Sequence, residues 1–148
     1  MNDSYKVLGV GEAFSIKCFR KYAEVADGNI EVVTSEAQCV SEAIKLIESG
    51  GVQGVFMTNL ALKDYGLRRY DAEVSGFNDK ENPANDVYSG GLAVVRRALD
   101  KGIATFVAGR TDDEEALRRA ESMGARIDMT PLDGFKNAHA LFLEMSRK

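Results

Sequence analysis

Tyr5-Lys6-Val7-Leu8-Gly9-Val10 is the first apolar run of the sequence, and the class of fold follows from it and from what comes after it. It is short, mainly apolar and bounded by glycine, so it predicts a buried β-strand. The next stretch, from Phe14 to Ala26, repeats apolar residues at helical spacing, namely Ile16, Phe19, Ala23 and Ala26. That spacing predicts an amphipathic helix, because residues three and four positions apart share one helix face. A strand followed at once by a helix is the first unit of an alternating α/β chain.

The same alternation recurs along the rest of the chain. Apolar runs predict four further strands at 30–33, 52–57, 103–107 and 125–129. Amphipathic stretches predict helices at 35–47, 89–99, 111–123 and 133–146. Strands separated by helices pair in parallel, with right-handed crossovers and helices on both faces. We therefore expect an α/β three-layer sandwich, with a five-stranded parallel sheet in the flavodoxin-like order 2-1-3-4-5.

Local signals place the ends of several of these helices. Ser35–Gln38 and Thr111–Glu114 both have the form of a capping box, in which side chains bond the free amides of the first helical turn. Gly50-Gly51 and Gly124 predict helix ends, because glycine adopts the left-handed conformation at low cost. We expect one domain over 1–148, interrupted after the third strand by an exposed insertion at about 60–88 that has no clear strand or helix pattern.

The composition limits the classes of protein to which the chain belongs. Its 148 residues carry 19 basic and 23 acidic side chains, a net charge of −4, which argues against a nucleic-acid partner. No apolar run reaches the roughly 20 residues that cross a bilayer, and the first residues do not form an export signal. We therefore expect a cytoplasmic protein without a membrane partner. One histidine and two cysteines are too few for a zinc or haem site, so we expect no metal and no cofactor.

The opening stretch Lys6-Val7-Leu8-Gly9-Val10-Gly11-Glu12-Ala13-Phe14 resembles the start of a response-regulator receiver domain. The similarity continues at 91–99, which is similar to the third helix of that family. Residues 116–125 are similar to its fourth helix and the start of its fifth strand. Thr130-Pro131 stands where the family has Lys-Pro. The resemblance implies the five-stranded fold already expected from the alternation of strands and helices.

The resemblance also implies a reaction, in which a carboxylate after the third strand accepts a phosphoryl group. Two acidic residues after the first strand hold Mg²⁺, and a hydroxyl and a lysine after the fourth and fifth strands stabilise the phosphoryl oxygens. Carried over to this chain, these positions form a degenerate receiver pocket made of Glu12, Thr58 or Asn59, Thr111 and Thr130, with Ala108 where the hydroxyl is expected.

The missing carboxylate has a direct chemical consequence. Without it an acyl phosphate cannot form, so we interpret the chain as a pseudo-receiver, a phosphorylation-independent signalling or regulatory module that binds a protein partner or itself. The resemblance implies a partner face on the fourth helix, fifth strand and fifth helix. Its members here are the exposed side of 133–147 together with Glu115, Arg118, Arg119 and Arg126.

The alternative function is a small-ligand-binding protein or a divergent enzyme of flavodoxin-like fold, with its pocket at the strand ends under 60–88. Its candidate acidic groups are Asp64, Asp79, Glu81 and Asp86. Arg110 is a possible anion contact at a helix start. Gly9 and Gly11 form a G-x-G pattern without the third glycine of a dinucleotide site. We interpret them as close helix–strand packing at Gly9 and a tight turn at Gly11.

Three further interpretations concern ionisable side chains. Arg96-Arg97 and Arg118-Arg119 are expected to lie on solvated helix faces. His139 lies far along the chain from any predicted strand end, so we expect it to be solvated or to act as a cap, and we assign it no catalytic role. For Glu12, two interpretations stay open, a residual cation ligand and an acidic residue that interacts with a helix N-terminus.

Overall fold

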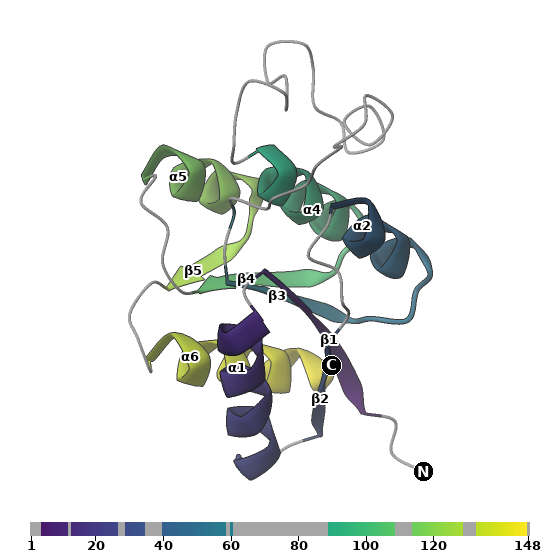
Figure 1. The fold of residues 1–148 in the computed structure, drawn as a ribbon, viewed down its shortest axis with the longest axis vertical. Helices are drawn as coiled ribbons and strands as arrows, with labels where there is room; N and C mark the ends of the chain where they lie inside the picture. The colour runs from purple at the N-terminus through teal and green to yellow at the C-terminus, as the bar shows by residue number, and fades with distance from the viewer. Residues whose placement is uncertain are drawn as a thin grey trace.

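The structure of this chain is a computed structural model that describes residues 4–11, 13–26, 29–34, 40–58, 60, 89–108, 114–128 and 133–147. Within these residues, strands and helices alternate in the order that the sequence predicts. Figure 1 shows a central sheet with helices above and below it. The insertion expected at 60–88 lies outside the described residues, apart from Leu60.

Five strands form one sheet, and every neighbouring pair in it is parallel. In spatial order the strands are β2 (Ile30–Thr34), β1 (Tyr5–Val10), β3 (Gly54–Met57), β4 (Ala104–Ala108) and β5 (Arg126–Asp128). This order confirms the flavodoxin-like prediction. β3 is buried at every position, as is typical of a central parallel strand covered on both faces.

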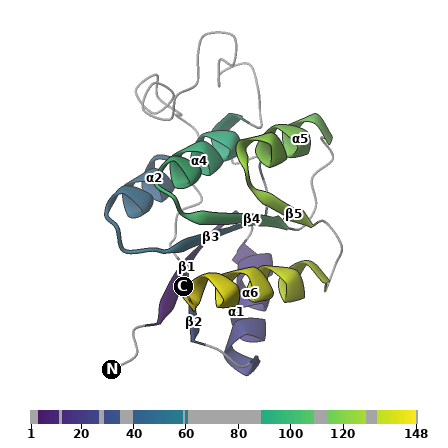
Figure 2. The same ribbon diagram turned by 180° about the vertical axis from the view of Figure 1, so that it is seen from behind.

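Two layers of helices enclose the sheet. One layer holds α2 (Val40–Glu48), α4 (Ser89–Asp100) and α5 (Glu114–Met123), and the other holds α1 (Ala13–Val25) and α6 (Asp133–Ser146). The view from behind in Figure 2 shows the same division. The three-layer sandwich is therefore confirmed.

The sheet separates two hydrophobic cores. Val55 and Met57 of β3 belong to the core under α2, α4 and α5, whereas Phe56 belongs to the core under α1 and α6. This division follows from the two-residue period of a strand, which sends neighbouring side chains to opposite faces. The second core is aromatic, and the rings of Phe19 and Phe56 stack with their centroids 4.0 Å apart.

Two glycines allow α1 and α6 to approach the sheet closely. A Cβ atom at Gly9 would lie 2.5 Å from Cγ2 of Ile16, and one at Gly54 would lie 2.8 Å from the ring of Phe142. Neither position has room for a side chain, because the interior is already packed at close contact. Gly9 is thus a packing position, as predicted. Gly11 has a φ angle of 124°, which fits the predicted tight turn.

The ends of the elements agree with most of the local signals that the structure describes. Gly50 and Gly124 have φ angles of 76° and 117°, and they follow the ends of α2 and α5 as predicted. β3 begins at Gly54, two residues later than predicted, since its ladder with β1 starts at the pair Val7 and Gly54. Ser35–Gln38 lies outside the described residues, and so does the start of the second predicted capping box.

Candidate functional site

The carboxyl ends of the three central strands meet at one edge of the sheet. β1 and β3 end in register at the pair Val10 and Met57, and β4 is aligned with β3 in the same direction. Gly11, Thr58 and Ala108 therefore lie beside one another at this edge. In a doubly wound sheet, this is the edge at which ligands bind.

Thr58 is one of the two positions, with Asn59, at which the resemblance places the phosphoryl acceptor. Its backbone N–H donates a hydrogen bond to the carbonyl oxygen of Val10 over 3.0 Å, which ties it to the end of β1. The residue is buried, with 4% of its surface exposed. A threonine hydroxyl is uncharged and is not a carboxylate, so it cannot form the acyl phosphate of the receiver reaction.

Ala108 provides no hydroxyl at the end of β4. It is buried, and the first turn of α6 packs against it. A Cβ atom at Gly134 would lie 3.5 Å from Cβ of Ala108 and 3.1 Å from the carbonyl oxygen of Asp128. The space beside this strand end is therefore filled by helix packing. A methyl group there cannot stabilise phosphoryl oxygens, which require hydrogen-bond donors or positive charge.

The other residues of the predicted pocket lie outside the described residues, and their convergence on Thr58 stays a prediction. They are Glu12, Asn59, Arg110, Thr111 and Thr130. The same holds for the acidic residues of the alternative pocket, Asp64, Asp79, Glu81 and Asp86. Within the described ranges, no group of three or more His, Cys, Asp or Glu residues is placed to hold a metal ion.

The predicted partner face on α5, β5 and α6 is mostly polar at its described surface. Glu115, Arg118 and Arg126 are exposed, whereas Arg119 is half-buried. Arg118 forms an ion pair with Glu114 one turn earlier, at 3.4 Å, between side chains that are more than three-quarters exposed. Such exposed pairs contribute little stability. Partner binding at this face stays a prediction.

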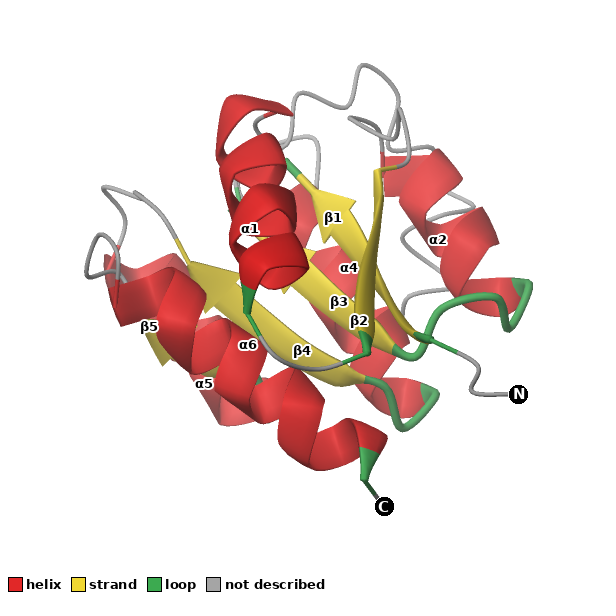
Figure 3. Cartoon of the chain, turned by 90° about the horizontal axis from the view of Figure 1, so that it is seen from below, coloured by secondary structure: helices red, strands yellow, loops and turns green. Residues whose placement is uncertain are grey.

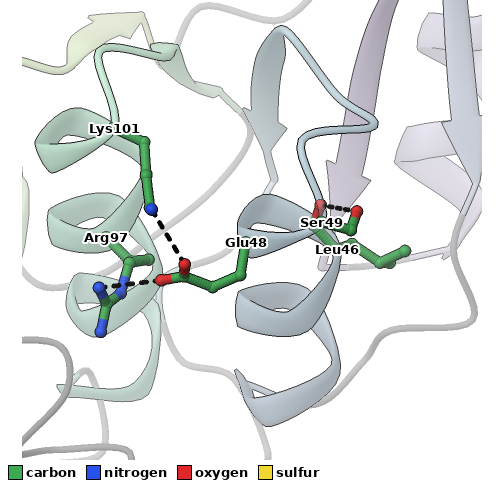
Figure 4. Close-up of polar contacts among 5 residues, drawn as sticks. All are labelled: Leu46, Glu48, Ser49, Arg97 and Lys101. Atoms are coloured by element: carbon green, nitrogen blue, oxygen red, sulfur yellow. Dashed lines mark hydrogen bonds and ion pairs between the residues drawn. The ribbon is translucent and has the colours of Figure 1, made fainter.

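An ion cluster that the sequence did not reveal joins α2 to α4. Figure 4 shows Glu48 at the end of α2 between Arg97 and Lys101 of α4. Oε1 of Glu48 lies 2.9 Å from Nη1 of Arg97, and Oε2 lies 3.1 Å from Nζ of Lys101. The side chain of Arg97 is only 15% exposed. The prediction that Arg96-Arg97 is a solvated pair is therefore wrong, because α2 packs beside α4 and both residues are half-buried.

His139 is buried between α6 and α1, which contradicts the expected solvated or capping role. It is 7% exposed, and its ring meets the ring of Tyr22 edge to face at a centroid distance of 5.8 Å. Nε2 has no hydrogen-bond partner among the described residues. Burial lowers the pKa of this imidazole below its ordinary value. The signal was present in the helical spacing, since residue 139 is four positions after Phe135 and three before Phe142.

Comparison with known proteins gives structural neighbours only. No protein-family model matches the chain, and no curated protein matches it. The signal receiver domain of a protein described as a Luxo repressor from Vibrio parahaemolyticus is 17% identical, with a TM-score of 0.63 over 97% of this chain and 93% of that domain. The response regulator domain of Thermotoga maritima CheB is 15% identical, with a TM-score of 0.58 over 97% and 94%.

This chain has the fold of a receiver domain. The same fold occurs in a CpaE pilus assembly protein from Burkholderia thailandensis E264, at 12% identity and a TM-score of 0.54 over 96% of each chain. Identities this low show the fold alone, and one fold hosts many functions. Function must therefore be argued from the strand-end site and the surface. In the described parts of the chain, no helix has the length and apolar character needed to cross a membrane.

Proposed function

We propose that this receiver-like chain is a signalling or regulatory module that acts through protein contacts and accepts no phosphoryl group. The observation that carries the proposal is Thr58, a buried neutral residue at the end of β3, beside the ends of β1 and β4. The likeness to receiver domains supports the signalling role, and the chemistry of Thr58 and Ala108 supports the loss of phosphotransfer.

Two groups that the receiver reaction needs are replaced in this chain by uncharged side chains. The acyl phosphate of the receiver reaction forms on a carboxylate, and Thr58 offers only a hydroxyl. The charge of the incoming phosphoryl group is stabilised by preorganised donors, and Ala108 offers a methyl group. A module of this kind changes state only when a partner binds one of its conformations more tightly than another.

Incubation with acetyl phosphate and Mg²⁺, followed by intact-mass measurement, tests the proposal. A receiver domain that gives a phosphoryl adduct when treated in parallel serves as the positive control. We expect no phosphoryl adduct on this chain under conditions that phosphorylate the control. A stoichiometric adduct that hydroxylamine removes would identify an acyl phosphate and would end the proposal.

A further inference from the structure

Two rows of contact join α1 to α6, which Figure 3 shows on the same face of the sheet. The inner row is aromatic, and the ring centroid of Phe19 lies 6.0 Å from that of Phe135 and 6.2 Å from that of Phe142. The outer row holds the contact between Tyr22 and His139, whose rings meet edge to face with their centroids 5.8 Å apart. We call these five residues the α1–α6 seam.

Tyr22 and His139 both lie at the border between the buried and the exposed face of their helix. On α1, Phe14 and Val25 face solvent and are 71% and 84% exposed, whereas Tyr22 is 37% exposed. On α6, His139 is 7% exposed, whereas Lys136, one turn earlier, is exposed. A rotation of the side chain between staggered rotamers therefore moves the imidazole from the seam into water while α6 stays helical.

The imidazole of His139 suits the seam only in its neutral form. Nε2 is buried and has no hydrogen-bond partner among the described residues. In the neutral ring one nitrogen is an acceptor, whereas both nitrogens of the imidazolium are donors. A buried ionised group without a partner is strongly destabilised. Burial accordingly lowers the pKa of His139 below its ordinary value.

The described residues of α1 provide no carboxylate for the imidazolium. The titratable groups on the side of α1 near His139 are Cys18 and Tyr22, a thiol and a phenol one turn apart. Glu24 is two residues after Tyr22, so it lies about 160° around the helix from it. Its carboxylate is already paired with Arg20 at 3.7 Å.

Neither α6 nor the sheet presents a carboxylate to the imidazole among the described residues. The groups on these sides are a phenol and three cations, namely Tyr5, Arg126, Lys136 and Arg147. The carboxylate of Asp128 accepts a hydrogen bond from Nδ2 of Asn137, which is two residues before His139 and lies on the opposite side of α6. Asp133 and Glu144 lie about 120–140° around the helix from His139. A proton on His139 thus adds a positive charge without a counter-charge.

We propose that His139 is a pH-sensitive switch that controls the α1–α6 seam. The neutral imidazole closes the seam against Tyr22. The protonated imidazole turns into water, Tyr22 loses its contact, and α1 separates from α6 around that turn. The layer of α2, α4 and α5 keeps its packing, because its core does not include His139. The inference goes beyond the proposed function, since a proton and not a protein partner shifts the equilibrium.

The size of the effect follows from the titration of His139. In the open seam the imidazole is hydrated and has its ordinary pKa of 6.5, whereas in the closed seam the pKa is lower. Below the closed-state pKa, the ratio of open to closed molecules is larger than at neutral pH by about tenfold for each pH unit that separates the two pKa values. Well above pH 6.5 this ratio no longer depends on pH, because His139 is neutral in both states.

Two measurements on the whole chain test the inference. The first follows the imidazole proton signal by ¹H NMR from about pH 5 to about pH 8, and it needs no assignment because the chain contains one histidine. The second measures amide hydrogen exchange over the same range, corrected for the intrinsic exchange rates. It compares the protection of amides in α1 with that of amides in α5, which lies on the other face of the sheet.

Four substitutions separate the switch from a general effect of pH. His139→Phe keeps a ring in the seam and removes the titration, and His139→Gln is the second variant in case the first does not fold. Lys136→Gln removes the adjacent positive charge, and Lys45→Gln makes the same change at an exposed position on α2.

We expect a titration midpoint for His139 below pH 6.5, and a loss of protection in α1 relative to α5 that matches the factor calculated from that midpoint. Both His139 variants should abolish this pH dependence. Lys136→Gln should raise the midpoint, whereas Lys45→Gln should leave it unchanged.

The inference would be overturned by a midpoint at or above pH 6.5, since the imidazolium would then be stabilised inside the seam. Equal losses of protection in α1 and α5 would overturn it too, because protonation would then destabilise the whole fold. So would a pH dependence that survives in the His139 variants, or equal midpoints in the two lysine variants. None of these results depends on acetyl phosphate, so failure here and failure of the proposed function are separate results.

Discussion

The contact between β3 and α6 allows a quantitative test of the fold. A methyl group placed at Gly54 would lie 2.8 Å from the ring of Phe142 and 3.1 Å from that of Tyr5, so Gly54→Ala forces the packing apart. Overpacking of this kind costs about 1–3 kcal/mol of stability. Phe142 is fully buried, and Phe142→Ala is expected to cost about 3–5 kcal/mol because it leaves a cavity.

The two substitutions should not be independent. In the double variant, the new methyl group occupies part of the space that the ring has left. The free energy lost by the double variant should therefore be smaller than the two single losses together, by about 1–3 kcal/mol. Part of the cost of Gly54→Ala remains, because Tyr5 still lies beside the new methyl group.

Urea unfolding followed by circular dichroism measures all four members of this cycle. Leu117→Ala is the matched control, since α5 packs on the other side of the sheet and shares no core with Phe142. Gly54→Ala and Leu117→Ala should be additive to within about 0.5 kcal/mol. Additivity of Gly54→Ala with Phe142→Ala would refute the placement of α6 on β3.

Three further substitutions test contacts elsewhere in the fold. Glu48→Gln removes the carboxylate that α2 shares with two basic side chains of α4. Urea unfolding should show a free energy of unfolding lower by about 1 kcal/mol at low salt, and the difference should shrink at high salt. A loss independent of salt would contradict an ionic contact. His139 has a folded-state pKa below its ordinary value of 6.5, so the stability due to its neutral form is complete above pH 6.5 and decreases as the pH falls through the folded-state pKa. His139→Gln should therefore flatten the dependence of the urea midpoint on pH in that range, and an unchanged pH profile would show that His139 is not the titrating group. Gly91→Ala places a Cβ atom against the carbonyl oxygen of Leu60. Because this neighbour is backbone and cannot move aside easily, thermal unfolding should show a loss of about 1–3 kcal/mol; a melting temperature equal to that of the wild type would contradict this contact.

The layout of the sheet could be predicted because its signals are local. Apolar runs predict the strands, and helical spacing predicts the helices. Glycines such as Gly9 and Gly124 indicate a close approach of a helix to a strand or the end of a helix. The helical spacing predicts the last helix at 133–146, and it is observed over Asp133–Ser146. When five strands alternate with helices, the right-handed crossovers allow only a few spatial orders of the strands in the sheet.

The features that could not be predicted depend on contacts between distant segments. Glu48 meets Arg97 only because α2 lies beside α4, and nothing in the sequence near either residue indicates this pair. The exposure of Phe14 likewise depends on which face of α1 the sheet covers. His139 is an intermediate case, because its helical spacing relative to Phe142 is compatible with burial and only the contact with α1 decides it.

Amide NMR spectra of the uniformly ¹⁵N-labelled chain test whether the strand-end site responds to a phosphoryl donor. Spectra recorded with Mg²⁺ and acetyl phosphate are compared with spectra recorded with Mg²⁺ and acetate. We predict that the signals of Gly11, Thr58 and Ala108 coincide in the two spectra. The proposed loss of phosphotransfer would be contradicted by new signals for these strand-end amides that appear only with acetyl phosphate and fade as the acetyl phosphate hydrolyses.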